Sequence, residues 1–112
     1  NQAENDLLNR CNVLLDQISD LLQRDYDDSE MCALISFCYN LGIGSFSKST
    51  LLKMLNEDSI DSAKQILRWD KAGGKPARGL RIRRICEYLL FMTGKMESYA
   101  QCASLLGNYY QS

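Results

Sequence analysis

The residues most suited to chemistry lie in one stretch, "RWDKAGGKPARGLRIRR", at residues 68–84. It combines the single tryptophan of the chain, a Gly-Gly pair and a cluster of Lys and Arg, with one acid, Asp70. A phosphate-binding loop of the G-x-x-x-x-G-K-[ST] type needs a preceding strand and a following helix, whose N–H groups converge on the anion. Here a helical pattern precedes the glycines, and Lys75 is followed by proline, which has no N–H to donate. The stretch therefore does not predict a phosphate loop.

The arginines of the same stretch suggest nucleic-acid binding as an alternative. Arg78, Arg81, Arg83 and Arg84 crowd the start of a predicted helix, and such a basic helix can neutralise phosphates. However, the whole chain has a formal net charge of −1, and no aromatic residues alternate with these arginines. We therefore do not expect a nucleic-acid partner.

Charge is distributed unevenly along the chain. Residues 1–30 carry eight acidic and two basic side chains, whereas residues 64–112 carry three acidic and nine basic ones. The two ends can complement each other within the fold, which we take as the default, or the basic end can face an anionic partner.

The residue types present exclude several kinds of catalysis. The chain has no histidine, so Ser-His and Cys-His catalytic groups are excluded. The usual zinc-site spacings of Cys and His are also absent, and we expect no metal and no cofactor. Carboxylate pairs of the glycosidase kind remain. All five glutamates fall in predicted helices or at helix starts, where we expect solvated faces, caps or helix-dipole contacts, so no catalytic residue is assigned.

The five cysteines include no C-x-x-C pair, and we expect five unpaired thiols on apolar helical faces. Cys32 and Cys38 would lie about 9 Å apart along one helix, too far to form a disulfide. Free thiols suit a reducing compartment, which predicts a cytoplasmic protein of a bacterial host or phage. The chain begins at Asn1 rather than methionine, so we expect an upstream segment to have been removed; if this was a signal, the location is periplasmic. No apolar run is long enough to span a membrane.

Apolar periodicity predicts an all-α fold of about six helices, with residues 1–112 as one domain. The expected helices are residues 7–22, 31–41, 50–56, 57–69, 80–92 and 96–110. Residues 73–79 contain three glycines and a proline and predict a loop, and no segment has the period of a β-strand. The fourth helix is expected to turn inward its apolar residues Ile60, Ala63, Ile66 and Leu67.

The helix at residues 31–41 is predicted to lie at the centre of the fold. It is apolar on every face, so other helices should surround it. Asp28 and Ser29 are candidate N-caps, and Gly42 is placed to end the helix. The predicted core residues are Leu34, Ile35, Phe37, Cys38 and Leu41.

Three motifs, "ALISFCYNLGIGSFSKSTLLKMLN", "RWDKAGGK" and "GLRIRRICEYLLF", resemble in order and spacing the C-terminal lobe of the phage-type lysozymes. These endolysin muramidases cleave the bond between N-acetylmuramic acid and N-acetylglucosamine in peptidoglycan. The resemblance covers residues 3–94 and implies the helical fold of that lobe. Residues 95–112 have no counterpart, and we expect them to form an extra C-terminal helix.

The resemblance implies that residues 68–84 form an elbow between two helices, near the rim of a glycan cleft. The implied glycan- or partner-binding residues are Tyr39, Asn40, Trp69, Lys71, Gly73, Gly74, Lys75 and Arg78. Arg83, Arg84 and Glu87 match the family's R-R-x-x-E, which we interpret as a structural ion-pair network. Two departures affect the shape of the loop: Pro76 directly follows Gly-Gly-Lys, and Arg78 stands where the family often has proline.

The family's catalytic glutamate lies in an N-terminal helix before a β-hairpin lobe, and no residue here matches it. We favour the hypothesis that this lysozyme lobe is repurposed as a non-catalytic binding or regulatory protein with a protein partner. The alternative is the C-terminal part of a peptidoglycan-degrading muramidase, whose catalytic glutamate lies upstream or on another chain. A weaker third hypothesis is an anion or nucleic-acid binder that uses the arginine helix. Under the first two, these 112 residues do not hydrolyse peptidoglycan by themselves.

Overall fold

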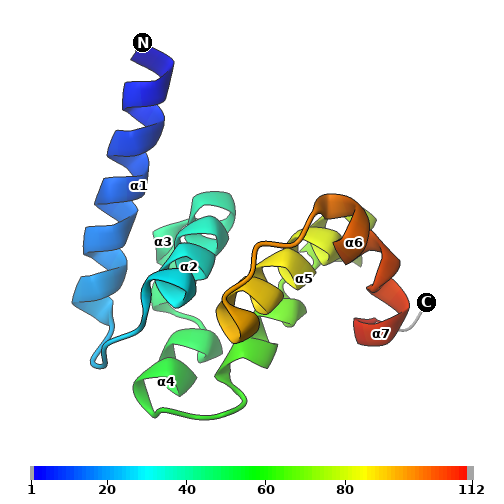
Figure 1. Ribbon diagram of the computed structural model, residues 1–112. Coiled ribbons are helices and arrows are strands. Elements are labelled where there is room, and N and C mark those ends of the chain that lie inside the picture. Colours follow the sequence, from blue (N-terminus) through cyan, green and yellow to red (C-terminus); the bar gives the residue numbers. More distant parts are fainter. Residues whose placement is uncertain (1, 111–112) are drawn as a thin grey trace.

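The computed structural model describes residues 2–110, and the side chains of residues 6–110. It confirms the predicted all-α fold class (Figure 1). The described part also contains one pair of two-residue strands. In chain order, the elements are α1 (Gln2–Leu21), α2 (Asp28–Leu41), α3 (Ile43–Ser47), α4 (Thr50–Asn56), the 3₁₀ helix η1 (Ser62–Arg68), β1 (Lys71–Ala72), β2 (Lys75–Pro76), α5 (Arg78–Thr93), α6 (Tyr99–Ser104) and α7 (Leu106–Tyr109).

Helix α2 begins with a capping box one residue before the predicted caps. The Asp27 carboxylate accepts a hydrogen bond from the Glu30 N–H at 2.8 Å, and the Glu30 carboxylate accepts one from the Asp27 N–H at 2.9 Å. Because this reciprocal pair satisfies two backbone donors at once, Asp27 is the cap rather than Asp28 or Ser29. The helix ends at Gly42, as predicted.

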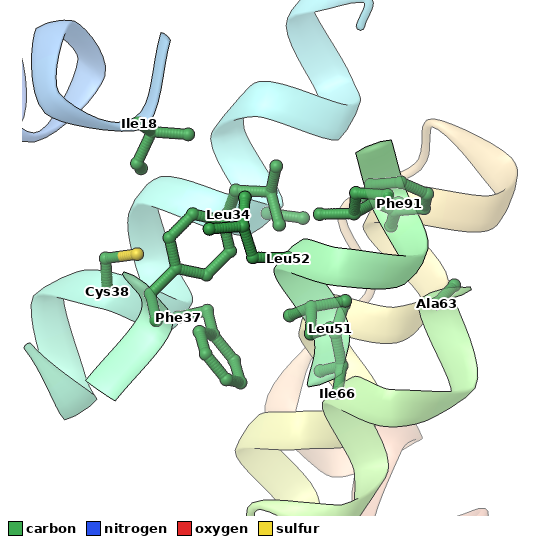
Figure 2. Close-up of a cluster of buried hydrophobic side chains, with 12 residues drawn as sticks. Ile18, Leu34, Phe37, Cys38, Leu51, Leu52, Ala63, Ile66 and Phe91 are labelled. Carbon is green, nitrogen blue, oxygen red and sulfur yellow. The ribbon is translucent and has the colours of Figure 1, made fainter. Parts of the chain in front are cut away.

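The central position of α2 is confirmed, since it packs against α1, α3 and α5. Leu34, Phe37 and Cys38 are buried, as predicted, whereas Ile35 and Leu41 are only partly buried at the edge of the core. Figure 2 shows buried side chains of α2 within a cluster of apolar side chains from other elements. The buried members from those elements include Ile18 of α1, Leu51 and Leu52 of α4, Ala63 and Ile66 of η1, and Phe91 of α5.

Helix α1 packs against the core through one end only. Its C-terminal half contributes the buried Ile18, with Leu14 and Leu21 packed beside it. Leu7 and Leu8, toward the other end, are largely exposed although they belong to the same apolar pattern. Helix α1 stands at one side of the molecule, and α6 and α7 lie at the opposite side (Figure 1).

The helix predicted for residues 57–69 is shorter than expected and is a 3₁₀ helix. Asp58 has a φ of 55°, in the left-handed region, so a right-handed helix cannot run through it. The chain re-enters a helix only at Ser62. Ala63 and Ile66 reach the core as predicted, but Ile60 precedes the helix and is 92% exposed, which contradicts its predicted inward position.

The last part of the chain covers α5. Helix α5 ends at Thr93, one residue beyond the predicted residues 80–92, and is capped by Gly94, which has a φ of 76°. Residues 99–110, which we call the C-terminal cap, comprise α6, α7 and Tyr110. The cap packs on α5 around a second, smaller core whose buried members are Ile82, Ile85 and Cys102.

The prediction of five unpaired thiols is wrong for one pair. Cys86 of α5 and Cys102 of α6 form a disulfide, with 5.8 Å between their Cα atoms. The remaining cysteines are free, but they are not uniformly buried: Cys38 is buried, Cys11 is partly exposed and Cys32 is exposed. The spacing argument concerned two cysteines on one helix, whereas the disulfide joins two helices that only the tertiary fold brings together.

Candidate functional site

A hairpin, formed by β1 and β2 (residues 71–76), lies at the tip of the predicted elbow. The strands are antiparallel, with Lys71 opposite Pro76, and the turn between them is Gly73-Gly74. These glycines have φ values of 58° and 82°. Two-residue hairpin turns with both φ values positive match the twist of the strands and strongly favour glycine. The sequence analysis expected no strand, because it interpreted the Gly-Gly pair only as a helix breaker.

The base of the hairpin is fixed to the core and to α5. The Trp69 ring packs edge-on against Phe37, with 5.7 Å between centroids and 84° between planes. Asp70 is 6% exposed, and its carboxylate lies 2.9 Å from Arg81 Nε. The Asp70 carbonyl accepts a hydrogen bond from the Ala77 N–H at 2.9 Å, which closes the hairpin. The base is therefore held in place while the tip projects into solvent.

The tip presents the polar groups that the resemblance singled out. All five predicted residues there are exposed: Lys71, Gly73, Gly74, Lys75 and Arg78. Ammonium, guanidinium and backbone N–H groups in such a position donate hydrogen bonds to hydroxyl, carbonyl or anionic groups. Trp69 is less available than the sequence implied, because its ring is partly buried and packs against Phe37 of the core.

The end of α2 supplies the two other predicted residues, and the structure separates them. Asn40 lies near the base of the hairpin: its Oδ1 accepts a hydrogen bond from Arg84, whose guanidinium carbon is 5.3 Å from the Phe37 ring centroid. The same Phe37 ring contacts Trp69. Tyr39 instead lines a pocket of about 400 Å³ between α1 and the α2–α3 junction.

Glu87 is the centre of a buried polar network between α2 and α5. Its carboxylate lies 3.0 Å from Arg84 Nη1 and 3.4 Å from Arg83 Nε, and it accepts a hydrogen bond from Ser36 at 2.6 Å. Arg84 is fully buried, and Glu87 is 3% exposed. The expectation that every glutamate has a solvated setting is therefore wrong for Glu87. The reason is that α5 packs against α2, which encloses this face of α5.

Burial and charge act in opposite directions on this network. Burial raises the pKa of Glu87, while Arg84 and the Ser36 hydroxyl oppose that rise. Burial likewise lowers the pKa of Arg84, and Glu87 opposes it. The Arg84–Glu87 ion pair lies within α5, where each charge compensates the other, because an unpaired buried charge is strongly destabilising. Two hydrogen bonds, from Ser36 to Glu87 and from Arg84 to Asn40, join this pair to α2.

Buried carboxyl groups are the first candidates for the acid of a glycosidase. The two buried carboxylates among residues 6–110 are Asp70 and Glu87, and both are paired with arginine. Glu87 lines a pocket of about 390 Å³ between α2, α5 and the start of α6, but it is the one carboxylate among that pocket's described lining residues. Glycosidases require two carboxyl groups on either side of the scissile bond. Cys38 is not a nucleophile either, since burial raises the pKa of its thiol to about 12.

Three polar contacts around the candidate site were not predicted from the sequence, and they involve Ser36, Asp70 and Tyr110. The sequence offered an indication for Ser36, because it is the one serine within an otherwise apolar stretch of α2 and would need a polar partner there. Asp70 could also have been noticed, because it is the only acid in residues 68–84 and an arginine of the same stretch is its expected partner. That partner is Arg81. The sequence offered no indication for Tyr110, whose hydroxyl donates a hydrogen bond to the Leu67 carbonyl.

The expected pairing of the acidic and basic ends is not made by direct contacts. Among the described side chains, no ion pair joins residues 6–30 to residues 64–110. The hairpin side chains Lys71 and Lys75 are exposed. None of the helices seen in residues 2–110 has the length and apolar character needed to cross a bilayer.

The sequence is similar to phage lysozymes and endolysins. The family model described as phage lysozyme matches residues 1–87, which include α2 and the whole stretch 68–84. The endolysin of Bacillus phage B103 is 38% identical over 101 residues, covering 89% of this chain, and that of Bacillus phage PZA is 36% identical over 104 residues, covering 92%. The SAR-endolysin of bacteriophage PS119 is 41% identical over 80 residues, covering 70%. The aligned part spans 38%, 40% and 48% of these three relatives, so the chain covers less than half of each.

Proposed function

The chain belongs to the phage lysozyme family, and from that premise we propose that it binds the glycan strand of peptidoglycan with the hairpin and the adjoining end of α2. The observation that carries the proposal is the exposed hairpin tip on a rigid base, within the part of the chain that the family model matches. Lys71, Lys75 and Arg78 offer donors to the hydroxyl, acetamido and carboxylate groups of peptidoglycan. Asn40 adds an amide beside the base of the hairpin.

In this proposal the 112 residues bind peptidoglycan without cleaving it. The buried carboxylates Asp70 and Glu87 are both paired with arginine, and neither faces a second carboxylate in a described pocket. A muramidase needs a protonated carboxyl group aimed at the glycosidic oxygen. The general acid would then come from residues outside these 112, upstream or on another chain.

The proposed function implies a different location from the cytoplasm, which was expected from the cysteines. Peptidoglycan lies outside the cytoplasmic membrane, so the proposal places the chain's action there rather than in the cytoplasm. The disulfide between Cys86 and Cys102 supports an oxidising compartment, in which such bonds persist.

A protein partner remains the second candidate, and one feature favours it. Leu7, Leu8 and Val13 of α1 are about half exposed or more, and Val13 and Tyr39 line the pocket of about 400 Å³ beside them. Apolar groups grouped in this way suit a polypeptide surface. The sequence alone led us to favour this repurposed role, but the endolysin similarity over most of the chain now favours the peptidoglycan role.

The test is co-sedimentation of the chain with purified peptidoglycan. We expect the chain to pellet with the polymer, and we expect Lys71→Ala combined with Lys75→Ala to reduce the bound fraction about tenfold, as for the loss of two hydrogen-bonding cations. The matched control is Lys48→Ala combined with Lys53→Ala, which removes the same charge from exposed positions of the α3–α4 region. Equal retention of both double variants would refute the hairpin as the binding site. A pull-down that recovers a protein partner, lost on Leu8→Ser but unaffected by the hairpin variant, would instead support the second candidate.

A further inference from the structure

Tyr110, the last residue of the C-terminal cap, contacts both ends of the segment that carries the hairpin. Its hydroxyl donates a hydrogen bond to the carbonyl of Leu67, at the end of η1 just before the hairpin. Its ring lies under the guanidinium of Arg81, at 4.7 Å from the ring centroid, on the first turn of α5 just after the hairpin. One side chain therefore links the element that enters the hairpin to the element that leaves it.

Arg81 passes this contact on to the base of the hairpin. Its Nε lies 2.9 Å from the carboxylate of Asp70, a residue that is 6% exposed. The carbonyl of the same Asp70 accepts the Ala77 N–H that closes the hairpin. The path from Tyr110 to the hairpin thus consists of a cation–π contact, an ion pair and one backbone hydrogen bond.

The C-terminal cap is itself held firmly on α5, so that Tyr110 approaches from a fixed platform. The disulfide joins Cys102 of α6 to Cys86 of α5. The rings of Tyr88 and Tyr109 pack edge-on, with 5.4 Å between centroids. Burial also raises the pKa of Tyr110, which keeps its hydroxyl a donor across the physiological range.

We propose that Tyr110 is a positioning residue for the hairpin: it holds η1 and α5 together, through Leu67 and Arg81, in the arrangement that presents Lys71 and Lys75. For its consequence in glycan binding, this inference rests on the proposed function. The family model ends at residue 87, before the cap, whereas the alignments with the two Bacillus phage endolysins extend into the cap. The expectation that residues 95–112 have no counterpart is therefore wrong for the first part of that segment.

The test compares Tyr110→Leu with Tyr109→Leu, which removes a ring of the same cap that contacts Tyr88 instead of the hairpin path. The first readout is hydrogen exchange of the Ala77 amide, and the second is the emission of Trp69, the only tryptophan of the chain. We expect Tyr110→Leu to speed Ala77 exchange about tenfold, from one lost hydrogen bond and one lost cation–π contact, and to change the emission of Trp69. Tyr109→Leu should leave both readouts at the values of the unmodified chain. Tyr110→Phe keeps the ring under Arg81 and should fall between the two.

Co-sedimentation with peptidoglycan then separates the two proposals. If the unmodified chain binds peptidoglycan, Tyr110→Leu should weaken retention and Tyr109→Leu should not. If the unmodified chain does not bind, the proposed function fails, while the exchange and emission readouts still decide the positioning role. That role is overturned if the Ala77 amide exchanges at the same rate in Tyr110→Leu and Tyr109→Leu. If Tyr110→Leu fails to fold, Tyr110→Phe, which disturbs packing least, decides instead. The role is then overturned if Tyr110→Phe leaves both readouts unchanged.

Discussion

At the scale of single residues, Phe37 supports both parts of the candidate site. Its ring packs edge-on against Trp69 at 5.7 Å and against Phe46 at 6.3 Å, measured between centroids. The guanidinium of Arg84, which also holds Asn40, lies over the same ring. Phe37 is fully buried, so it orients the hairpin base and the end of α2 from below without reaching solvent.

We therefore predict that Phe37→Ala lowers the free energy of unfolding by about 3–5 kcal/mol, the cost of deleting a buried aromatic ring. Urea unfolding followed by far-UV circular dichroism measures this difference. Tyr39→Ala, a substitution of an exposed ring two positions further along α2, is the control and should cost far less. A loss below about 1 kcal/mol for Phe37→Ala would show that α2 is not the central helix.

Cys38 gives the fold a dependence on alkaline pH. Burial raises the pKa of its thiol from the ordinary 9.0 to about 12. The folded state therefore favours the neutral thiol, and this contribution is fully present below pH 9 and is lost as the pH rises toward 12. We predict that stability falls between pH 9 and pH 11, and falls less steeply in Cys38→Val, which cannot ionise. Urea midpoints at the two pH values measure this; identical slopes in both proteins would contradict the role of Cys38.

At the scale of elements, Gly42 determines how the chain passes from α2 to α3. It has a φ of 90° and a ψ of 147°, a combination that residues with a Cβ rarely adopt, although no atom lies within 4 Å of where its Cβ would be. We predict that Gly42→Ala lowers the free energy of unfolding by about 1–3 kcal/mol through backbone strain alone. Gly44→Ala is the matched control, because Gly44 lies within α3 with equal space and no positive φ, and alanine should there be neutral or stabilising. Thermal unfolding of both variants measures the change in stability. An equal loss of stability in the two variants would exclude backbone strain at Gly42 as the cause.

The disulfide is a second property of an element, since it joins α6 to α5. We predict that the denatured chain, alkylated without reductant, is modified at Cys11, Cys32 and Cys38 only, and at five cysteines after reduction. The Cα–Cα distance of 5.8 Å between Cys86 and Cys102 lies within the usual range for a disulfide. Because the bond closes a loop with a separation of 16 residues, its loss should cost about 3 kcal/mol. Five modified thiols before reduction, found by mass spectrometry, would contradict the bond.

At the scale of the whole molecule, the acidic and basic ends lie apart rather than paired. No direct ion pair joins the two ends among the described side chains, and α1 lies opposite the C-terminal cap (Figure 1). The hairpin side chains Lys71 and Lys75 are exposed, and none of the acidic side chains described in residues 6–30 is ion-paired with them. Under the proposed function, this exposed hairpin would contact the glycan strand, and other residues would supply the acid for hydrolysis.

We predict that the 112-residue chain causes no loss of turbidity in a suspension of peptidoglycan between pH 4 and pH 8. The reason is that Asp70 and Glu87, the buried carboxylates among the described side chains, are both occupied by arginine. Release of reducing sugars provides a second, more sensitive measurement. Lysis that is abolished by Glu87→Gln, in a variant that keeps its far-UV spectrum, would overturn this prediction.

Much of the fold was accessible from local sequence patterns. The apolar period of residues 31–41 together with Gly42 predicted where α2 lies and ends, and the apolar pattern of residues 80–92 predicted the position of α5. Such features are local, because periodicity and backbone conformation depend on neighbouring residues. Two predictions were wrong for the same reason, at the Gly-Gly hairpin and at Asp58. Residues that break a helix indicate that the chain turns, but they do not determine which kind of turn it forms. The position of the candidate hairpin came from the resemblance, since its motifs are contiguous in the sequence.

The tertiary structure alone decided which side chains of distant elements meet. Ser36 and Glu87 are 51 residues apart, Tyr110 and Leu67 are 43 apart, and Cys86 and Cys102 belong to different helices. Whether Glu87 is solvated or buried depends on which face of α5 packs against α2, and periodicity predicts only that one face of the helix is buried. The disulfide and the contacts of Tyr110 likewise depend on how separate helices pack. Their partners are selected by how whole helices pack, a long-range property that no short window of this sequence contains.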